Sequence, residues 1–184
     1  MMEGAYVGDH AHCSVNPFVG RENVSLNKDG NGRKVVIIGA GVAGLTAAEL
    51  LARRGFDVTV LEKADAAGGQ INLADKPPHK GKLHWCVEDL VTNAVENGAK
   101  IKYSVTASED IIREYAPEYV IVATGGNAIK PKAFDKENVV TVTDVLDGSV
   151  KLSGKKICVI GSGMTGLETS ELLVSQGNHV SVVE

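Results

Sequence analysis

Apolar runs alternate with glycine-rich turns and helical periodicity along the first third of the chain. Residues 35–38 form a run of Val and Ile that is typical of a strand buried on both faces of a parallel sheet. After the turn at 39–44, apolar residues recur at helical spacing, at Leu45, Ala48, Leu51 and Ala52. Gly55 is typical of a helix end, and residues 58–61 form a second apolar run. The pattern predicts a strand, a helix and a second strand.

The same pattern occurs a second time. KVVIIGAGVAGLTAAELLARRGFDVTVLE at 34–62 aligns without a gap to KICVIGSGMTGLETSELLVSQGNHVSVVE at 156–184, and every glycine has a glycine opposite it. A long match of this kind differs from the short-period repeats of a solenoid. We interpret it as two copies of one functional unit.

The segments between the two copies predict further elements of an α/β fold. Residues 82–97 have apolar positions spaced for an amphipathic helix, which ends at Gly98. Residues 101–105 predict a short strand, and residues 120–123 predict an apolar strand that runs into a glycine turn.

The glycine turn of each copy has the spacing of a dinucleotide-binding fingerprint. Gly39 allows a tight turn from strand to helix, Gly41 lets the backbone approach a pyrophosphate, and Gly44 lets the helix pack against the strand. The helix start offers unpaired N–H groups to phosphate. Glu62 follows the second strand, where a carboxylate accepts hydrogen bonds from the adenosine ribose. The second copy has the corresponding residues, Gly161, Gly163, Gly166 and Glu184, and Ser170 replaces Ala48.

Composition excludes several other classes of protein. Hydrophobic residues make up 43% of the 184 residues, which is typical of a globular chain, and the net charge of −4 gives no reason to expect nucleic acid or an anionic membrane as a partner. No run approaches the length of about 18 apolar residues that a membrane helix needs, so the cytoplasm is the expected location. The 3 cysteines form no CxxC pair, which argues against a disulfide framework or a complete metal site.

Two fingerprints in one chain resemble the glutathione-reductase-like flavoproteins, in which the first unit binds FAD and the second binds NAD(P)H. Gly68-Gly69-Gln70 is similar to their double-glycine turn, and Ala123-Thr124-Gly125 is similar to their ATG segment. The resemblance implies a Rossmann-like FAD-binding domain with a parallel sheet, at 33–150. The first βαβ unit of a second, NAD-binding domain would follow at 151–184, and 1–32 would be a junction segment.

The junction indicates a narrower family. Cys13-Ser-Val-Asn-Pro-Phe-Val-Gly-Arg-Glu and Pro78-His-Lys80 resemble segments of the family of 2,4-dienoyl-CoA reductase, trimethylamine dehydrogenase and the bile-acid and enoate reductases. That family implies an old-yellow-enzyme-like barrel with FMN as a partner. It also implies that NAD(P)H reduces FAD, that a [4Fe-4S] cluster passes the electrons from FAD to FMN, and that FMN reduces an activated alkene in the barrel. Cys13 would be the last cluster ligand only if missing sequence supplied the others, since the cluster needs four cysteines. We therefore expect a piece of a larger enzyme, truncated at both ends and weakly active or inactive alone.

The resemblance also predicts the residues that contact cofactors, while no catalytic residue is assigned. Glu184 favours NADH over NADPH, because its carboxylate would repel a 2′-phosphate. Two alternatives to a flavoprotein fragment remain open: a non-catalytic module that holds ADP, and a degraded reading frame that folds poorly. The predicted cofactor-binding residues are Gly39, Gly41, Val42, Ala43, Gly44, Glu62, Lys63, Gly69, Gln70, Lys80, Val105, Ala123, Thr124, Gly125, Gly161, Gly163, Met164, Thr165, Gly166 and Glu184.

Overall fold

A four-stranded parallel sheet forms the first part of the molecule. The computed structural model describes residues 13, 16, 18–20 and 23–184. The strand order is β3-β2-β1-β4, so both neighbours of β1 come from later in the chain. The strands are β1 (Lys34–Ile38), β2 (Asp57–Leu61), β3 (Lys100–Lys102) and β4 (Tyr119–Val122). All three strand pairs are parallel, which confirms the predicted α/β class.

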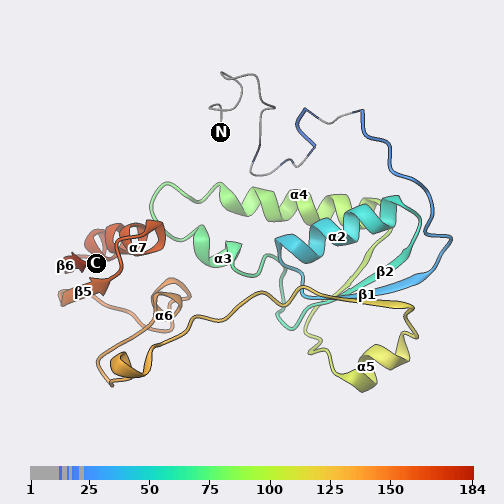
Figure 1. Ribbon diagram of the computed structural model, residues 1–184. Helices are drawn as coiled ribbons and strands as arrows, with labels where there is room; N and C mark the ends of the chain where they lie inside the picture. Colours follow the sequence, from blue (N-terminus) through green and yellow to red (C-terminus); the bar gives the residue numbers. More distant parts are fainter. Residues whose placement is uncertain (1–12, 14–15, 17, 21–22) are drawn as a thin grey trace.

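Two long helices pack beside each other against this sheet. They are α2 (Val42–Arg53) and α4 (Leu83–Glu96), and Figure 1 shows them side by side. The core between helices and sheet is formed by aliphatic residues with exposures of 9% or less, including Val35, Ile37, Leu45, Ala48, Val58, Val60, Leu90 and Ala94. The short elements that follow are α3 (Ile71–Ala74), α5 (Glu109–Glu114), the 3₁₀ turn η1 (Lys132–Phe134) and α6 (Val142–Leu146).

The second sequence copy forms its own parallel strand pair. It consists of β5 (Lys156–Ile160), α7 (Met164–Ser175) and β6 (His179–Val183). In Figure 1 this unit lies beyond α3 and α6, away from the four-stranded sheet. Helix α6 contacts both α3 and α7, so it joins the two parts of the molecule.

The two copies share a pattern but differ in burial. Ile37 of β1 and Leu61 of β2 have exposures of 0% and 1%, whereas Ile160 and Val183 at the ends of β5 and β6 have exposures of 56% and 46%. The difference in burial comes from the neighbouring strands. Within the described chain, β1 and β2 each have a strand on both sides, while β5 and β6 pair only with each other. The apolar strand β4 is also exposed, with Val122 at 70%, since it is the outer strand of its sheet.

Most predicted elements are present with small changes in their bounds. The predicted helix 82–97 is α4, and the predicted strand 120–123 is β4. The strand predicted at 101–105 was too long, since β3 ends at Lys102. Ser104 has a left-handed backbone (φ 57°), which turns the chain out of the strand and lets Val105 N–H bond to Glu62 O at 2.9 Å.

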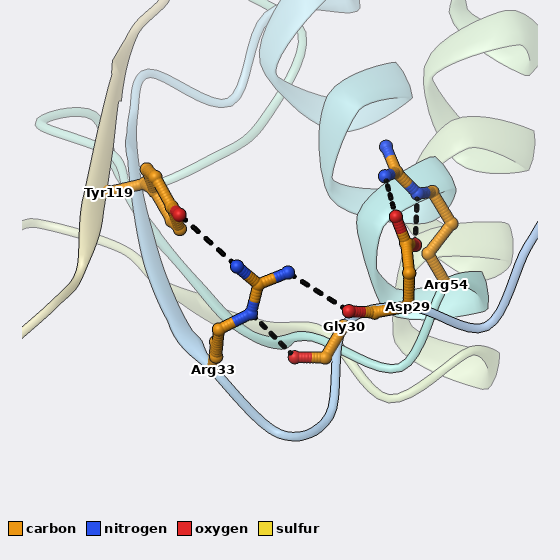
Figure 2. Close-up of polar contacts among 5 residues, drawn as sticks. All are labelled: Asp29, Gly30, Arg33, Arg54 and Tyr119. Carbon is orange, nitrogen blue, oxygen red and sulfur yellow. Dashed lines mark hydrogen bonds and ion pairs between the residues drawn. The ribbon is translucent and has the colours of Figure 1, made fainter.

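A polar cluster ties the start of β1 to its surroundings, as Figure 2 shows. The Arg33 guanidinium donates to Gly30 O at 3.2 Å, to Asp29 O at 2.9 Å and to the Tyr119 hydroxyl at 3.1 Å. Arg54 donates to both carboxylate oxygens of Asp29, at 2.9 and 2.6 Å, and this hydrogen bonding lowers the pKa of Asp29. We call these five residues the β1 anchor. The anchor lies at the amino end of the strand, opposite the glycine turn.

None of the helices in the described part of the chain is both long and apolar enough to span a membrane.

Candidate dinucleotide-binding sites

The turn after β1 has a backbone that requires glycine at two positions. Gly39 has φ +104°, and a Cβ there would lie 2.5 Å from Ala123 O. A Cβ at Gly44 would lie 1.9 Å from Gly39 O. Both distances are shorter than real contacts allow. The strand, the turn and the first turn of α2 can therefore pack this closely only with these glycines.

Gly41 has different surroundings. A Cβ at Gly41 would meet no atom of the described chain within 4 Å, and no described side chain caps α2 there. Val42 and Ala43, which follow, are exposed. The first turn of α2 thus borders open space and has no capping side chain among the described residues, which is the arrangement that binds the phosphates of a nucleotide.

Two further segments converge on Gly41. Gly68 N–H donates to Ala40 O at 2.9 Å, and a Cβ at Gly69 would lie 3.4 Å from Gly41 Cα. Gln70 Nε2 donates to Gly126 O at 2.8 Å, which joins the double-glycine turn to the segment after β4. The fingerprint, the double-glycine turn and the ATG segment therefore meet at the carboxyl edge of the sheet, where ligands of open α/β sheets bind.

Glu62 lies beside this loop with its carboxylate held by backbone amides. Oε2 accepts from Ala40 N–H at 2.7 Å, Oε1 accepts from Ala64 N–H at 2.9 Å, and the residue is 8% exposed. Each carboxylate oxygen has a second lone pair, so both oxygens can still accept from a ribose hydroxyl. Val105 is held next to Glu62 by its backbone. Burial and the charge of Glu62 raise the pKa of Tyr103.

The second copy reproduces the same turn. Gly161 has φ +106°, and a Cβ at Gly166 would lie 2.0 Å from Gly161 O. A Cβ at Gly163 would meet nothing within 4 Å, as at Gly41. Glu184 Oε2 accepts from both the N–H and the hydroxyl of Ser162, at 2.5 and 2.7 Å. These two hydrogen bonds lower the pKa of Glu184.

Lys80 lies between the two copies. Its Nζ is 2.5 Å from Oε1 of Glu168, which belongs to α7, and the two side chains are 31% and 27% exposed. The sequence predicts Lys80 as a cofactor contact, and that role stays a prediction. In the structure its side chain forms an ion pair that connects the segment after α3 to the helix of the second fingerprint.

The remaining predicted residues lie at exposed or partly exposed positions around the two loops. Lys63, Thr124 and Gly125 are exposed near the first loop, and Met164 and Thr165 are exposed at the start of α7. Ala123, which is partly exposed, donates its N–H to Ile38 O at 2.9 Å and so continues the pairing of β4 with β1. Their contacts with a cofactor stay predictions.

The sequence reasoning missed three groups that shape the sites: Ala64 N–H, the Ser162 hydroxyl and the Glu168 carboxylate. Ala64 donates its N–H to Glu62, and Glu168 forms an ion pair with Lys80; neither contact belongs to a sequence motif. Ser162 carried a usable signal, because it is a hydrogen-bonding residue between two fingerprint glycines, where the first copy has Ala40.

Cys13 is a free, partly exposed thiol. Burial, and after it the charges of Asp89 and Cys13, raise the pKa of the Cys86 thiol. Among the described residues, no group of three or more His, Cys, Asp or Glu side chains could hold a metal ion. The assignment of Cys13 as a cluster ligand therefore stays a prediction that depends on other sequence.

These features define a class of protein: an α/β chain with two dinucleotide-binding loops, each at the carboxyl end of a parallel strand and each next to a carboxylate. Residues 33–184 match the pyridine nucleotide-disulphide oxidoreductase family. The chain belongs to this family.

Relatives of known activity agree with this assignment. The chain is 37% identical to NADH oxidase from Thermoanaerobacter brockii and 36% identical to cinnamate reductase from Clostridium sporogenes, with 94% of this chain covered in each case. A structure of a 2-naphthoyl-CoA reductase complex superimposes with a TM-score of 0.85 at 34% identity over 96% of this chain. These relatives confirm the resemblance to the enoate reductase and trimethylamine dehydrogenase group. The chain spans only 28%, 26% and 27% of the three proteins.

Proposed function

We propose that the chain binds FAD at the first fingerprint and NAD(P)H at the second, as the electron-input part of a flavin-dependent oxidoreductase. The observation that carries the proposal is the exposed start of α2 at Gly41, with the Glu62 carboxylate held beside it. The α2 amides would bind the diphosphate, and Glu62 would accept from the adenosine ribose. The segments at 68–70 and 123–126 border the same space and would contact the flavin half of the nucleotide.

The bound nucleotides would supply the redox chemistry, which consists of hydride transfer between nicotinamide and flavin. The residues of this chain would position them. The Lys80–Glu168 ion pair would help to hold the two nucleotides in a fixed relative position. It connects the segment near the first loop to α7, the helix that begins at the second loop. The chain's own contribution is therefore orientation rather than acid–base chemistry, and no residue is assigned a proton-transfer role.

We further propose NADH as the preferred reductant. A carboxylate at the end of β6 accepts from a ribose 2′-hydroxyl and repels a 2′-phosphate. Glu184 is the residue in that position, and its lowered pKa favours the ionised form at neutral pH.

The complete protein would pass electrons from FAD through an iron–sulfur cluster to FMN, which would reduce an activated alkene. This finer proposal is supported by the likeness to cinnamate reductase and to 2-naphthoyl-CoA reductase, whose names identify them as reductases. Cys13 would be one cluster ligand, and the barrel with FMN would be the partner of this chain.

The proposal is tested by identifying the nucleotide that the purified protein releases on denaturation. We expect stoichiometric FAD and a flavin absorption spectrum in the native sample. Release of ADP from a colourless sample would overturn the flavin assignment and would favour a structural nucleotide module. A folded sample that releases no nucleotide and binds neither on addition would overturn both.

A further inference from the structure

The two fingerprint loops hold their carboxylates in different ways. In the first copy, backbone amides of Ala40 and Ala64 donate to Glu62, which is 8% exposed. In the second copy, Ser162 occupies the place of Ala40 and donates twice to the same oxygen of Glu184, once from its N–H and once from its hydroxyl. The extra hydroxyl bond is the chemical difference between the copies at this position.

This bond matters because it joins two side chains of the loop, Ser162 and Glu184, whereas the carboxylate of Glu62 is held by backbone amides. A glutamate side chain can rotate among several conformations, and fixing it costs conformational entropy. Two donors on Oε2 restrict the carboxylate before any nucleotide arrives. Oε1 is then the oxygen left to accept from a ribose hydroxyl.

The hydroxyl of Ser162 also has a defined direction. The hydroxyl donates its hydrogen to Glu184, with 2.7 Å between Oγ and Oε2. Toward any other group it can therefore offer only its lone pairs, as an acceptor. A serine next to Gly163 could otherwise donate to a diphosphate oxygen. In this structure the proton is directed to the carboxylate instead.

We propose that Ser162 is a positioning residue of the second nucleotide site, which orients Glu184 to accept from the adenosine ribose and thereby sets the preference for NADH over NADPH. This inference rests on the proposed NAD(P)H site. It assigns the discrimination to a pair of residues, Ser162 and Glu184, rather than to Glu184 alone.

The first test is a double-mutant cycle with Ser162→Ala and Glu184→Gln, read as the dissociation constants of NADH and NADPH. Without the orienting bond, NADH binding must itself order the Glu184 side chain, which costs up to about tenfold in affinity. We expect Ser162→Ala to weaken NADH about tenfold and to reduce the NADH/NADPH preference, and to have little further effect in the Glu184→Gln background. Ser162→Thr, which keeps the hydroxyl, should restore the preference. The proposal would be overturned if Ser162→Ala weakened the binding of NADH and NADPH equally and if its effect added to that of Glu184→Gln. That result would assign the Ser162 hydroxyl to the diphosphate.

Ser175→Ala is a matched control. Ser175 also lies in this unit, and its hydroxyl donates to Leu172 O at 2.7 Å, at the far end of α7 from Ser162. We expect no change in either dissociation constant. Retained FAD content in every variant would show that the first site remains folded.

The second test needs no nucleotide. The hydrogen bonds from the Ser162 N–H and hydroxyl lower the pKa of Glu184. The side-chain carboxyl signal of Glu184, identified by its loss in Glu184→Gln, should titrate at higher pH in Ser162→Ala than in the wild-type chain. An unchanged titration would overturn the positioning role. If the wild-type chain binds neither NADH nor NADPH, the proposed second site fails, and this titration still decides whether Ser162 positions Glu184.

Discussion

Gly41 and Gly44 belong to the same loop, yet the structure gives them separate roles. A Cβ at Gly44 would lie 1.9 Å from a backbone oxygen, whereas a Cβ at Gly41 would meet no described atom within 4 Å. Gly41 also has an extended backbone, with φ −80° and ψ −177°, that alanine can adopt. One glycine therefore serves packing, and the other leaves room for a ligand.

These surroundings predict opposite effects of alanine substitution. Gly44→Ala should lower the free energy of unfolding by about 3 kcal/mol, because the loop or α2 must move to admit the methyl group. Gly41→Ala should leave the unfolding transition of the nucleotide-free protein nearly unchanged and weaken FAD at least about tenfold, because the methyl group occupies the space for the diphosphate. Chemical denaturation and FAD titration of both variants measure this. A Gly41→Ala protein with unchanged FAD affinity would place the diphosphate elsewhere.

Residue spacing was enough to predict that the fingerprint glycines and Glu62 lie together, because their placement depends on a local strand–turn–helix geometry, while their contacts with a cofactor stay predictions. It could not predict Ala64 N–H or Glu168, since neither belongs to a motif. Ala64 acts through its backbone, which has no sequence signature, and Glu168 pairs with Lys80 across 88 residues of chain.

At the scale of elements, the apolar pattern predicted strand identity but not strand burial. β5 and β6 repeat the pattern of β1 and β2, yet Ile160 is 56% exposed because the described chain provides no further strands beside them. The short helices α5 and α6 were not predicted. Their signals were local, namely Ser108 as an N-cap of α5 and the capping box of Thr141 and Asp144 in α6.

Substitution of Arg33 in the β1 anchor should change the stability of the fold without changing the affinity for FAD. Arg33 makes three hydrogen bonds and lies over the Phe56 ring at 4.9 Å. Arg33→Gln should lower the free energy of unfolding by about 1–2 kcal/mol, because these contacts fix the entry of the chain into β1. FAD affinity of the folded variant should stay the same, since the anchor lies at the other end of the strand.

Arg113→Gln is the control for this prediction. Arg113 makes an ion pair with Glu109 on the same helix, with side chains 73% and 78% exposed, and such surface pairs contribute little. We expect a change of less than about 0.5 kcal/mol. If both substitutions lowered the free energy of unfolding equally, the β1 anchor would stabilise the fold no more than a surface ion pair does.

Among the described residues, the first nucleotide-binding loop follows buried strands, whereas the second follows strands that are more exposed. The contacts of α6 with α3 and α7, together with the Lys80–Glu168 ion pair, join the two. The internal repeat predicted both loops, because the fingerprint is local. It could not predict how the units are joined, since that depends on side chains in the connecting segments.

The central claim is that the start of α2 and Glu62 together bind the diphosphate and ribose of FAD. Titration of the nucleotide-free, cooperatively folded protein with FAD, followed by quenching of flavin fluorescence, tests this most directly. The account predicts saturable binding of one FAD per chain that ADP displaces. A folded sample that leaves flavin fluorescence unchanged, and that shows no affinity for ADP, would contradict it.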